Sequence, residues 1–256
     1  MAKPKFWIEA RSLSIGPASH NYLVLCTSND KGQTVRLAEL HGMAYNNKTK
    51  QFATIGYNSN HRLSGLHIVH DRKFDQEIPS SLKDISAVSK AKGLIAPYKG
   101  PDYRRTYVHE NQTRAVLITG TEQDIKARWL KGVEAANMLT EKNLPYPAGG
   151  FKLFKTPINS NSAYATYSEI MNLRVHNFPG VAEPGLKGRF LTPEEIDKFK
   201  YQPGKQETRQ AAPSGNKTTS LEPGVKYGRP TVVDGMARFS IKKPDFTCFS
   251  MESTGF

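Results

Sequence analysis

The chain has 256 residues, enough for one sizeable domain with a tail or for two small domains. Its 20 glycines, 16 prolines and 38% hydrophobic residues argue against a helix bundle and favour a loop-rich α/β or α+β protein. No stretch approaches the roughly 20 apolar residues that span a bilayer, so no transmembrane segment is expected. The net charge of +13 suits an anionic partner such as phospholipid, nucleic acid or cell-wall polymer, although the charge is spread without a block of like residues.

The N-terminal stretch, residues 1–16, carries charges but no apolar segment, so a classical signal peptide is not predicted. We expect synthesis in the cytoplasm, and export, where it occurs, by a dedicated secretion system. The two cysteines, Cys26 and Cys248, form neither a disulfide framework nor a zinc-binding spacing.

Strand patterns dominate the first part of the chain. The predicted strands are 6–15, two strands within 20–46 joined by a turn at 29–32, a hairpin within 51–71, and 114–120. Residues 72–113 have a mixed pattern that predicts no element.

Helical spacing begins at Thr121, a capping residue, and continues to about residue 140, with Trp129 expected in the core. A second helix with one apolar face is predicted within 161–173, and a short helix within 191–199 starts with a Thr cap and a proline. We divide the chain into a domain, 1–200, and a flexible linker or tail, 201–256, with room for one or two short strands.

The sequence "PINSNSAY" places Ser160 between Asn159 and Asn161 at the start of the second helix. The first turn of a helix presents unpaired N–H groups and the positive end of the dipole, which stabilise a developing negative charge. Ser160 is therefore a candidate nucleophile, and a simple helix cap is the competing interpretation. A second copy of the tripeptide, at 58–60, is predicted to be only a turn.

A hydroxyl nucleophile needs a base within hydrogen-bond reach. His20 begins one strand, and Glu39 and His41 share a face of the next because alternate residues of a strand point the same way. If the two strands pair, His20 lies beside Glu39 or His41, either of which can orient its imidazole.

This order of motifs, "HNYLVL" at 20–25, "ELHG" at 39–42 and "NSNSAY" at 159–164, resembles the circularly permuted papain-like group. That group includes PPPDE peptidases, lecithin:retinol acyltransferase-like enzymes and permuted NlpC-type peptidases. The resemblance covers roughly residues 5–185 and implies a papain-like α+β domain with an antiparallel sheet packed on helices. It extends to uncharacterised bacterial proteins of toxin or phage-like settings, which implies a bacterial effector.

In that register Ser160 stands where the family has its cysteine. The resemblance implies a hydrolase for peptide amides, including peptidoglycan cross-links, or for acyl esters of lipids, with no cofactor and with an immunity or delivery protein as a further partner. Asn159, Asn161 and Tyr146 are candidates for oxyanion or positioning roles, and Ser162 is the alternative nucleophile.

Serine in place of cysteine also fits a catalytically inactive module that binds an anionic partner such as lipid, cell wall or nucleic acid. No specific nucleic-acid-binding motif is present, although basic charge with 11 tyrosines is compatible with such binding. His61, His67, His70 and Asp71 form a cluster, but His67 and His70 would lie on opposite faces of a strand, so no metal site is predicted.

Overall fold

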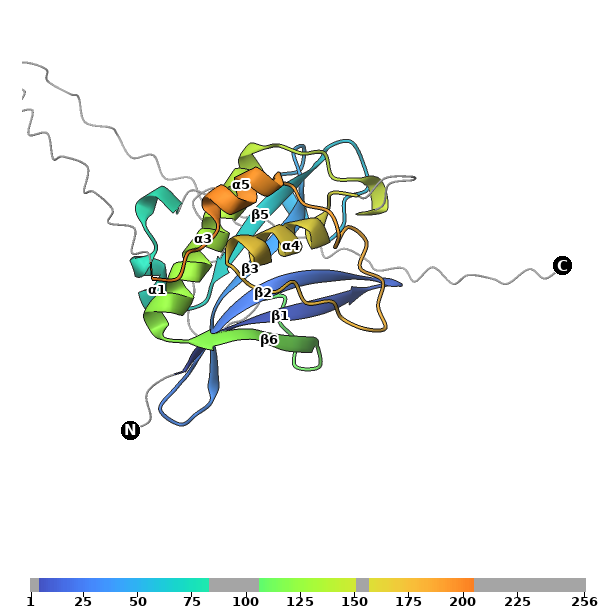
Figure 1. Cartoon of the computed structure of the whole chain (residues 1–256). Helices are drawn as coiled ribbons and strands as arrows, with labels where there is room; N and C mark the ends of the chain where they lie inside the picture. Colours follow the sequence, from blue (N-terminus) through green and yellow to red (C-terminus); the bar gives the residue numbers. More distant parts are fainter. Residues whose placement is uncertain (1–4, 83–105, 151–156, 205–256) are drawn as a thin grey trace, which may run out of the picture. The chain divides into compact units, whose positions relative to one another are not determined.

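The computed structural model describes residues 5–82, 106–150 and 157–204. A six-stranded antiparallel sheet packs against helices, which confirms the predicted α+β class (Figure 1). The strands are β1 (Phe6–Ile15), β2 (Ala18–Ser28), β3 (Thr34–Asn46), β4 (Gln51–Ala53), β5 (His61–Val69) and β6 (Thr113–Gly120). The helices are α1 (Arg72–Glu77), α3 (Glu122–Glu141), α4 (Ser160–Ile170) and α5 (Pro193–Phe199), with 3-10 turns η1 (Ser80–Leu82) and η2 (Ala148–Gly150). The predicted extension lies outside the described residues from position 205 onward.

The strand order is β4-β3-β2-β1-β6, and β5 also pairs with β3. The predicted strands at 6–15, within 20–46 and at 114–120 are confirmed. The predicted hairpin within 51–71 is wrong, because β4 and β5 both pair with β3 and not with each other. The long strand β3 has two edges, and at Ala44–Asn46 it holds β5 on one edge and β4 on the other.

One edge of β3 changes partner along its length. Pairing with β2 ends at Leu23 opposite Leu40, and pairing with β4 begins at Ala44 opposite Ala53. Over the interval between them, β2 remains paired with β1, and only a short bridge to Ala182 touches the start of β2, where the Ser19 N–H donates to the Ala182 carbonyl. We call this opening, between Ser19–Tyr22 of β2 and His41–Met43 of β3, the β2–β3 fork.

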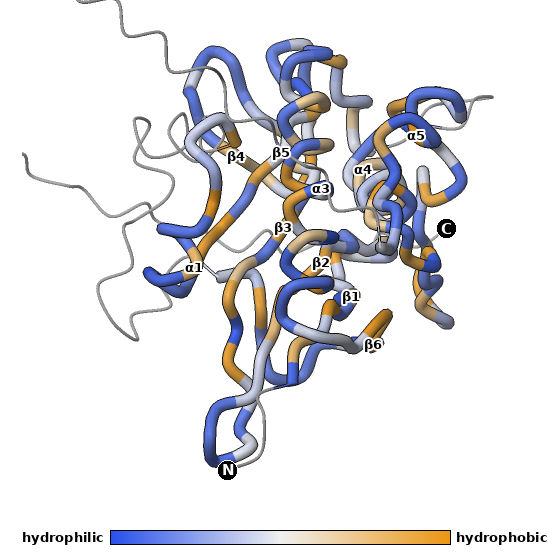
Figure 2. Tube along the Cα trace, turned by 60° about the vertical axis from the view of Figure 1, so that its left-hand side comes forward, coloured by the Kyte–Doolittle hydropathy of each residue, from blue (hydrophilic) through white to orange (hydrophobic). Residues whose placement is uncertain are grey.

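The main core lies between the sheet and helices α3, α4 and α5, and Trp129 is fully buried there as predicted. In Figure 2 apolar positions gather on the strands, while the connecting turns are mostly hydrophilic. Two glycines paired across β3 and β5 let the helices approach closely. A Cβ on Gly65 would lie 2.5 Å from the Ala136 carbonyl oxygen of α3, and one on Gly42 would lie 2.2 Å from the Ala163 Cβ of α4.

The first helix predicted from the sequence is confirmed as α3 with Thr121 as its N-cap, and α5 is confirmed with its Thr192 cap and its proline at the first position. The second predicted helix, α4, exists, but its single apolar face is a wrong expectation. Nearly every residue of α4 is buried, because the sheet, α3 and the chain between residues 176 and 190 surround it.

A methyl group at position 42 tests the close contact of α4 with β3. We expect Gly42→Ala to lower the free energy of unfolding by about 1–3 kcal/mol, because the new Cβ overlaps Ala163 and both neighbours are held by packed elements. Urea unfolding measures the change. Gly120→Ala, whose Cβ would make only 3.4 Å contacts, is the control, and an equal loss in both variants would contradict the expected overlap.

Candidate active site

The N-terminus of α4 fills the β2–β3 fork. Asn161 Oδ1 accepts a hydrogen bond from the Asn21 backbone N–H at 2.9 Å, and Asn161 Nδ2 donates to the Ser19 carbonyl at 3.0 Å. These two backbone groups flank His20 on the edge of β2 that β3 leaves unpaired. On the other side of the fork, the Cα of Ser160 lies 3.5 Å from the Cβ position of Gly42. The side chain of Asn161 thus replaces the missing strand, and Ser160 lies next to the backbones of both His20 and His41.

The side-chain amides of the two asparagines on either side of Ser160 use all their N–H groups to hold the start of α4 in place. Asn159 caps the helix by accepting from the N–H groups of Asn161 and Ser162, and its Nδ2 donates to the carbonyls of Gly150 and Pro184. Asn161 Nδ2 shares the Pro184 carbonyl. Because these amides have no donor left, the structure favours the positioning role for both over direct contact with an oxyanion.

The Ser160 hydroxyl has one hydrogen-bond partner among the described residues, the phenol of Tyr146 at 3.4 Å. Burial raises the pKa of Tyr146 against the opposing effect of its bonds to Ser160, so the phenol stays a neutral donor at neutral pH. Its oxygen also lies 3.3 Å from the Thr54 carbonyl. The Ser160 backbone N–H also interacts with the Tyr146 phenol oxygen, and this interaction opposes the rise in the Tyr146 pKa. Tyr146 therefore contacts both the hydroxyl and the backbone of Ser160.

Ser162, the alternative nucleophile, uses its hydroxyl in the capping box of α4. Its Oγ lies 2.7 Å from the Gly185 carbonyl and 3.0 Å from the Pro157 carbonyl, and it accepts from the Asn159 N–H. A hydroxyl with these partners holds the helix start in place, so the geometry favours Ser160 over Ser162 as the reactive residue.

The predicted histidines and carboxylate come together in one line of hydrogen bonds. His20 Nε2 lies 3.1 Å from His41 Nδ1, and His41 Nε2 lies 3.1 Å from Glu39 Oε2. Between the two alternatives for orienting His20, the structure places His41 in direct contact and Glu39 behind it. A carboxylate only accepts, so His41 carries its proton on Nε2 and accepts at Nδ1 from His20 Nε2–H. His20 Nδ1 then carries a lone pair, and this buried atom has no hydrogen-bond partner in the part of the chain that the structure describes.

Burial and hydrogen bonding set the charges along this line. Burial opposes ionisation of Glu39, but hydrogen bonds from His41 and His70 outweigh it and hold the Glu39 pKa below its usual range. Burial lowers the pKa of His20 well below 6.5, and the neighbouring His41 lowers it further. Burial also lowers the pKa of His41 against the attraction of Glu39. The resting site therefore holds one carboxylate and two neutral imidazoles.

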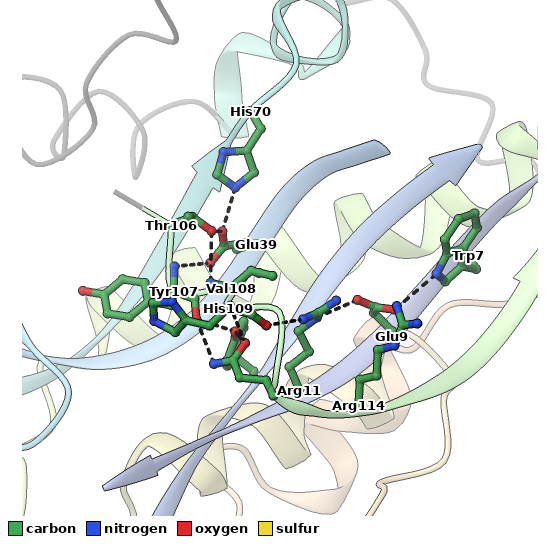
Figure 3. Close-up of polar contacts among 12 residues, drawn as sticks. Trp7, Glu9, Arg11, Glu39, His70, Thr106, Tyr107, Val108, His109 and Arg114 are labelled. Carbon is green, nitrogen blue, oxygen red and sulfur yellow. Dashed lines mark hydrogen bonds and ion pairs between the residues drawn. The ribbon is translucent and has the colours of Figure 1, made fainter. Parts of the chain in front are cut away.

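Glu39 has three further partners that the sequence did not indicate. His70 Nε2 lies 2.7 Å from Oε1, the Thr106 hydroxyl donates to the same oxygen, and the Tyr107 N–H donates to Oε2 at 3.0 Å (Figure 3). The Tyr107 ring lies against His41, with centroids 4.9 Å apart. His70 directly follows β5, and Thr106 and Tyr107 lie in the segment before β6. No spacing pattern in the sequence relates these residues to Glu39.

The imidazoles and Ser160 approach the fork from different sides. The rings of His20 and His41 stack with Tyr22 on the sheet face opposite α3 and α4, since Leu23 and Leu40 occupy the helix face. Within the described residues, no hydrogen bond joins Ser160 Oγ to His20 Nδ1.

The remaining histidines of the predicted cluster have separate roles. His61 bonds to Asn58 in the turn that contains the second NSN, and His67 Nε2 accepts from the Trp129 indole at 3.0 Å on the helix face. His70 contacts Glu39 on the other face. In the described part of the chain, no group of three or more His, Cys, Asp or Glu side chains has an arrangement that would hold a metal ion.

No protein-family model, curated protein or solved structure matches this chain. None of the helices in the described ranges combines the length and the apolar character that crossing a bilayer requires.

The buried imidazole of His67 predicts how the free energy of unfolding changes with pH. Burial, with smaller effects from His70 and His41, lowers its pKa to about 3, so folding holds it neutral. The free energy of unfolding is not reduced by His67 above pH 6.5. It decreases as the pH falls from 6.5 towards 3, because over this range only the unfolded chain takes up the proton. We expect His67→Gln, which keeps an acceptor for Trp129, to reduce this acid sensitivity by up to about 1.4 kcal/mol per pH unit. Urea unfolding from pH 7 to 4.5 measures it, and parallel curves would contradict it.

Proposed function

We propose that this protein is a serine-dependent amide or ester hydrolase that works through an acyl-enzyme on a permuted papain-like domain. The observation that carries the proposal is that His20 Nδ1 has no hydrogen-bond partner among the described residues, on a strand whose neighbouring residues Ser19 and Asn21 hold the start of α4, where Ser160 lies. Glu39 and His41 fix the tautomer that leaves this nitrogen unprotonated.

In the first step Ser160 Oγ attacks the substrate carbonyl carbon, and its proton passes to His20 Nδ1. The imidazolium that forms shares its charge through His41 with ionised Glu39. Burial makes the resting His20 a weak base, and this line of hydrogen bonds offsets the weakness in the transition state, when the positive charge appears.

The carbonyl oxygen becomes an oxyanion when the tetrahedral intermediate forms. The dipole of the eleven-residue helix α4 and the Tyr146 phenol supply positive potential and a hydrogen-bond donor beside Ser160. His20 Nδ1–H then protonates the leaving amine or alcohol, and the acyl group stays on Ser160. Water activated by the same nitrogen cleaves the ester, which releases the acid and restores both side chains.

The substrate class follows the family resemblance, which points to peptide amides, including peptidoglycan cross-links, and to acyl esters of lipids. A bacterial effector role in another cell's envelope, with an immunity or delivery partner, belongs to the same proposal and rests on the resemblance alone. The net charge of +13 suits either envelope substrate and does not separate them.

Labelling with a fluorophosphonate, followed by intact-mass analysis, tests the nucleophile and base. We expect one adduct on the wild type, its loss in Ser160→Ala, and at least about a hundredfold slower labelling in His20→Ala, because general-base catalysis contributes on this order. Ser168→Ala, which removes another buried hydroxyl from α4, is the matched control and keeps the adduct.

An adduct lost only in Ser162→Ala would assign the nucleophile to Ser162. No adduct on the folded wild type would contradict the serine mechanism and favour the binding module described below.

The pH dependence of labelling tests the base separately. Because the pKa of His20 lies well below 6.5, the imidazole stays unprotonated, and the labelling rate stays at its plateau, as the pH falls through 6.5. The rate then declines as the pH passes through the lowered pKa. Labelling rates between pH 4.5 and 8, on samples shown to be folded, measure this, and a midpoint at or above 6.5 would contradict it.

A binding module for an anionic partner is the second candidate. It is favoured by the burial of His20 and Ser160, of which Ser160 is only 5% exposed, and by the lack of a hydrogen bond between them. In that case wild type and Ser160→Ala bind anionic vesicles, peptidoglycan or nucleic acid equally, with affinity that falls steeply with salt.

A further inference from the structure

Glu39 has four hydrogen-bond donors around it on the outer face of the sheet, the face opposite α3 and α4. Its two oxygens accept from His41, His70, Thr106 and the Tyr107 N–H. A carboxylate offers about four lone-pair positions, so these four donors saturate it. Glu39 itself is fully buried, whereas His70 lies at the edge of the buried region with 9% of its surface exposed.

We propose that His70 is a positioning residue that acts through Glu39 to fix the protonation pattern of His41 and His20. The role of this pattern in catalysis rests on the proposed hydrolase function; the pattern itself does not. Oε1 takes the protons of His70 and Thr106, which leaves Oε2 for His41 and the Tyr107 N–H. His70 therefore decides which oxygen faces His41 and holds it in place.

A change in the position of the Glu39 carboxylate would affect His20, which is two hydrogen bonds away along this line. If Oε2 is free to rotate away, His41 loses the acceptor that keeps its proton on Nε2. His41 can then adopt the other tautomer, with its proton on Nδ1, and this nitrogen no longer accepts from His20 Nε2–H. The proton of His20 would move to Nδ1, and the lone pair on that nitrogen would disappear.

The segment that contains Thr106 and Tyr107 supports the same arrangement. The Tyr107 carbonyl accepts from the Tyr22 hydroxyl at 2.8 Å, and the Val108 N–H donates to the Thr106 hydroxyl. Arg11 Nη1 donates to the His109 carbonyl at 3.2 Å, which ties the segment to β1 (Figure 3). The two donors to Oε1 come from different parts of the chain, since His70 directly follows β5 and Thr106 belongs to this segment. Removal of the His70 donor therefore leaves the segment bonded to β1 and β2.

The test compares wild type, His70→Leu and His70→Gln by long-range ¹H–¹⁵N correlation of the histidine rings at neutral pH. The seven histidines are assigned by single substitution. In wild type we expect His20 and His41 to be protonated at Nε2 only. His70→Leu mixes or inverts the tautomers of both rings, and His70→Gln restores the wild-type pattern because its amide N–H donates to Glu39 in place of Nε2–H.

Fluorophosphonate labelling of the same proteins supplies the second readout. We expect it to slow about tenfold in His70→Leu and to stay within about threefold of wild type in His70→Gln, as suits loss of one hydrogen bond to a charged group. If His70→Leu does not fold, His70→Phe removes the same donor while keeping a ring at this position, and we expect the same mixed tautomers.

Unchanged tautomers in folded His70→Leu, or in His70→Phe when the first variant does not fold, would overturn the proposal. Wild-type protonation at His20 Nδ1 would overturn it as well. Tautomers that change in the His70 variant, on a wild type that forms no adduct, would support the role of His70 and reject the hydrolase, so the two failures are distinguishable.

Discussion

The hydrogen bonds of Asn161 in the β2–β3 fork are the constraint on which the candidate site depends. Strand β2 is not paired with β3 beyond Leu40, and without Asn161 the Ser19 carbonyl and the Asn21 N–H would lose the partners that they have there. Asn161 bonds to both groups, and this fixes the start of α4 against the residues that flank His20. Gly42 allows the approach from the other side, since a larger residue would displace Ala163.

The fork also explains how groups on two faces of one sheet can belong to a single site. A continuous ladder between β2 and β3 would separate the imidazoles from α4 by a layer of backbone. The opening between Leu40 and Ala44 interrupts that layer, and Ser160 lies beside it. The outer face carries the ionised carboxylate and the two imidazoles, and the helix face carries the hydroxyl with its nearby donors.

Burying a carboxylate such as Glu39 is costly unless hydrogen bonds replace its water. Here all four come from protein groups, and two of them belong to histidines. His20 extends this line by one further imidazole, and its Nδ1 has no hydrogen-bond partner among the described residues. Buried polar atoms without partners are rare in folded proteins, so this nitrogen is the atom of the line that is free to accept a proton.

The sequence by itself determined the elements with strong local signals. The alternation of 6–15 and 20–46, the cap at Thr121 and the asparagine before Ser160 specify strands and helix starts through backbone geometry and neighbouring hydrogen bonds. It also placed Glu39 and His41 on one face, because a strand repeats every two residues, and brought His20 beside them once the strands paired.

Only the tertiary structure decided the partner exchange along β3, the burial of α4 on all sides, and the bonds from His70 and Thr106 to Glu39. These depend on contacts between residues far apart in the chain, which no local periodicity records.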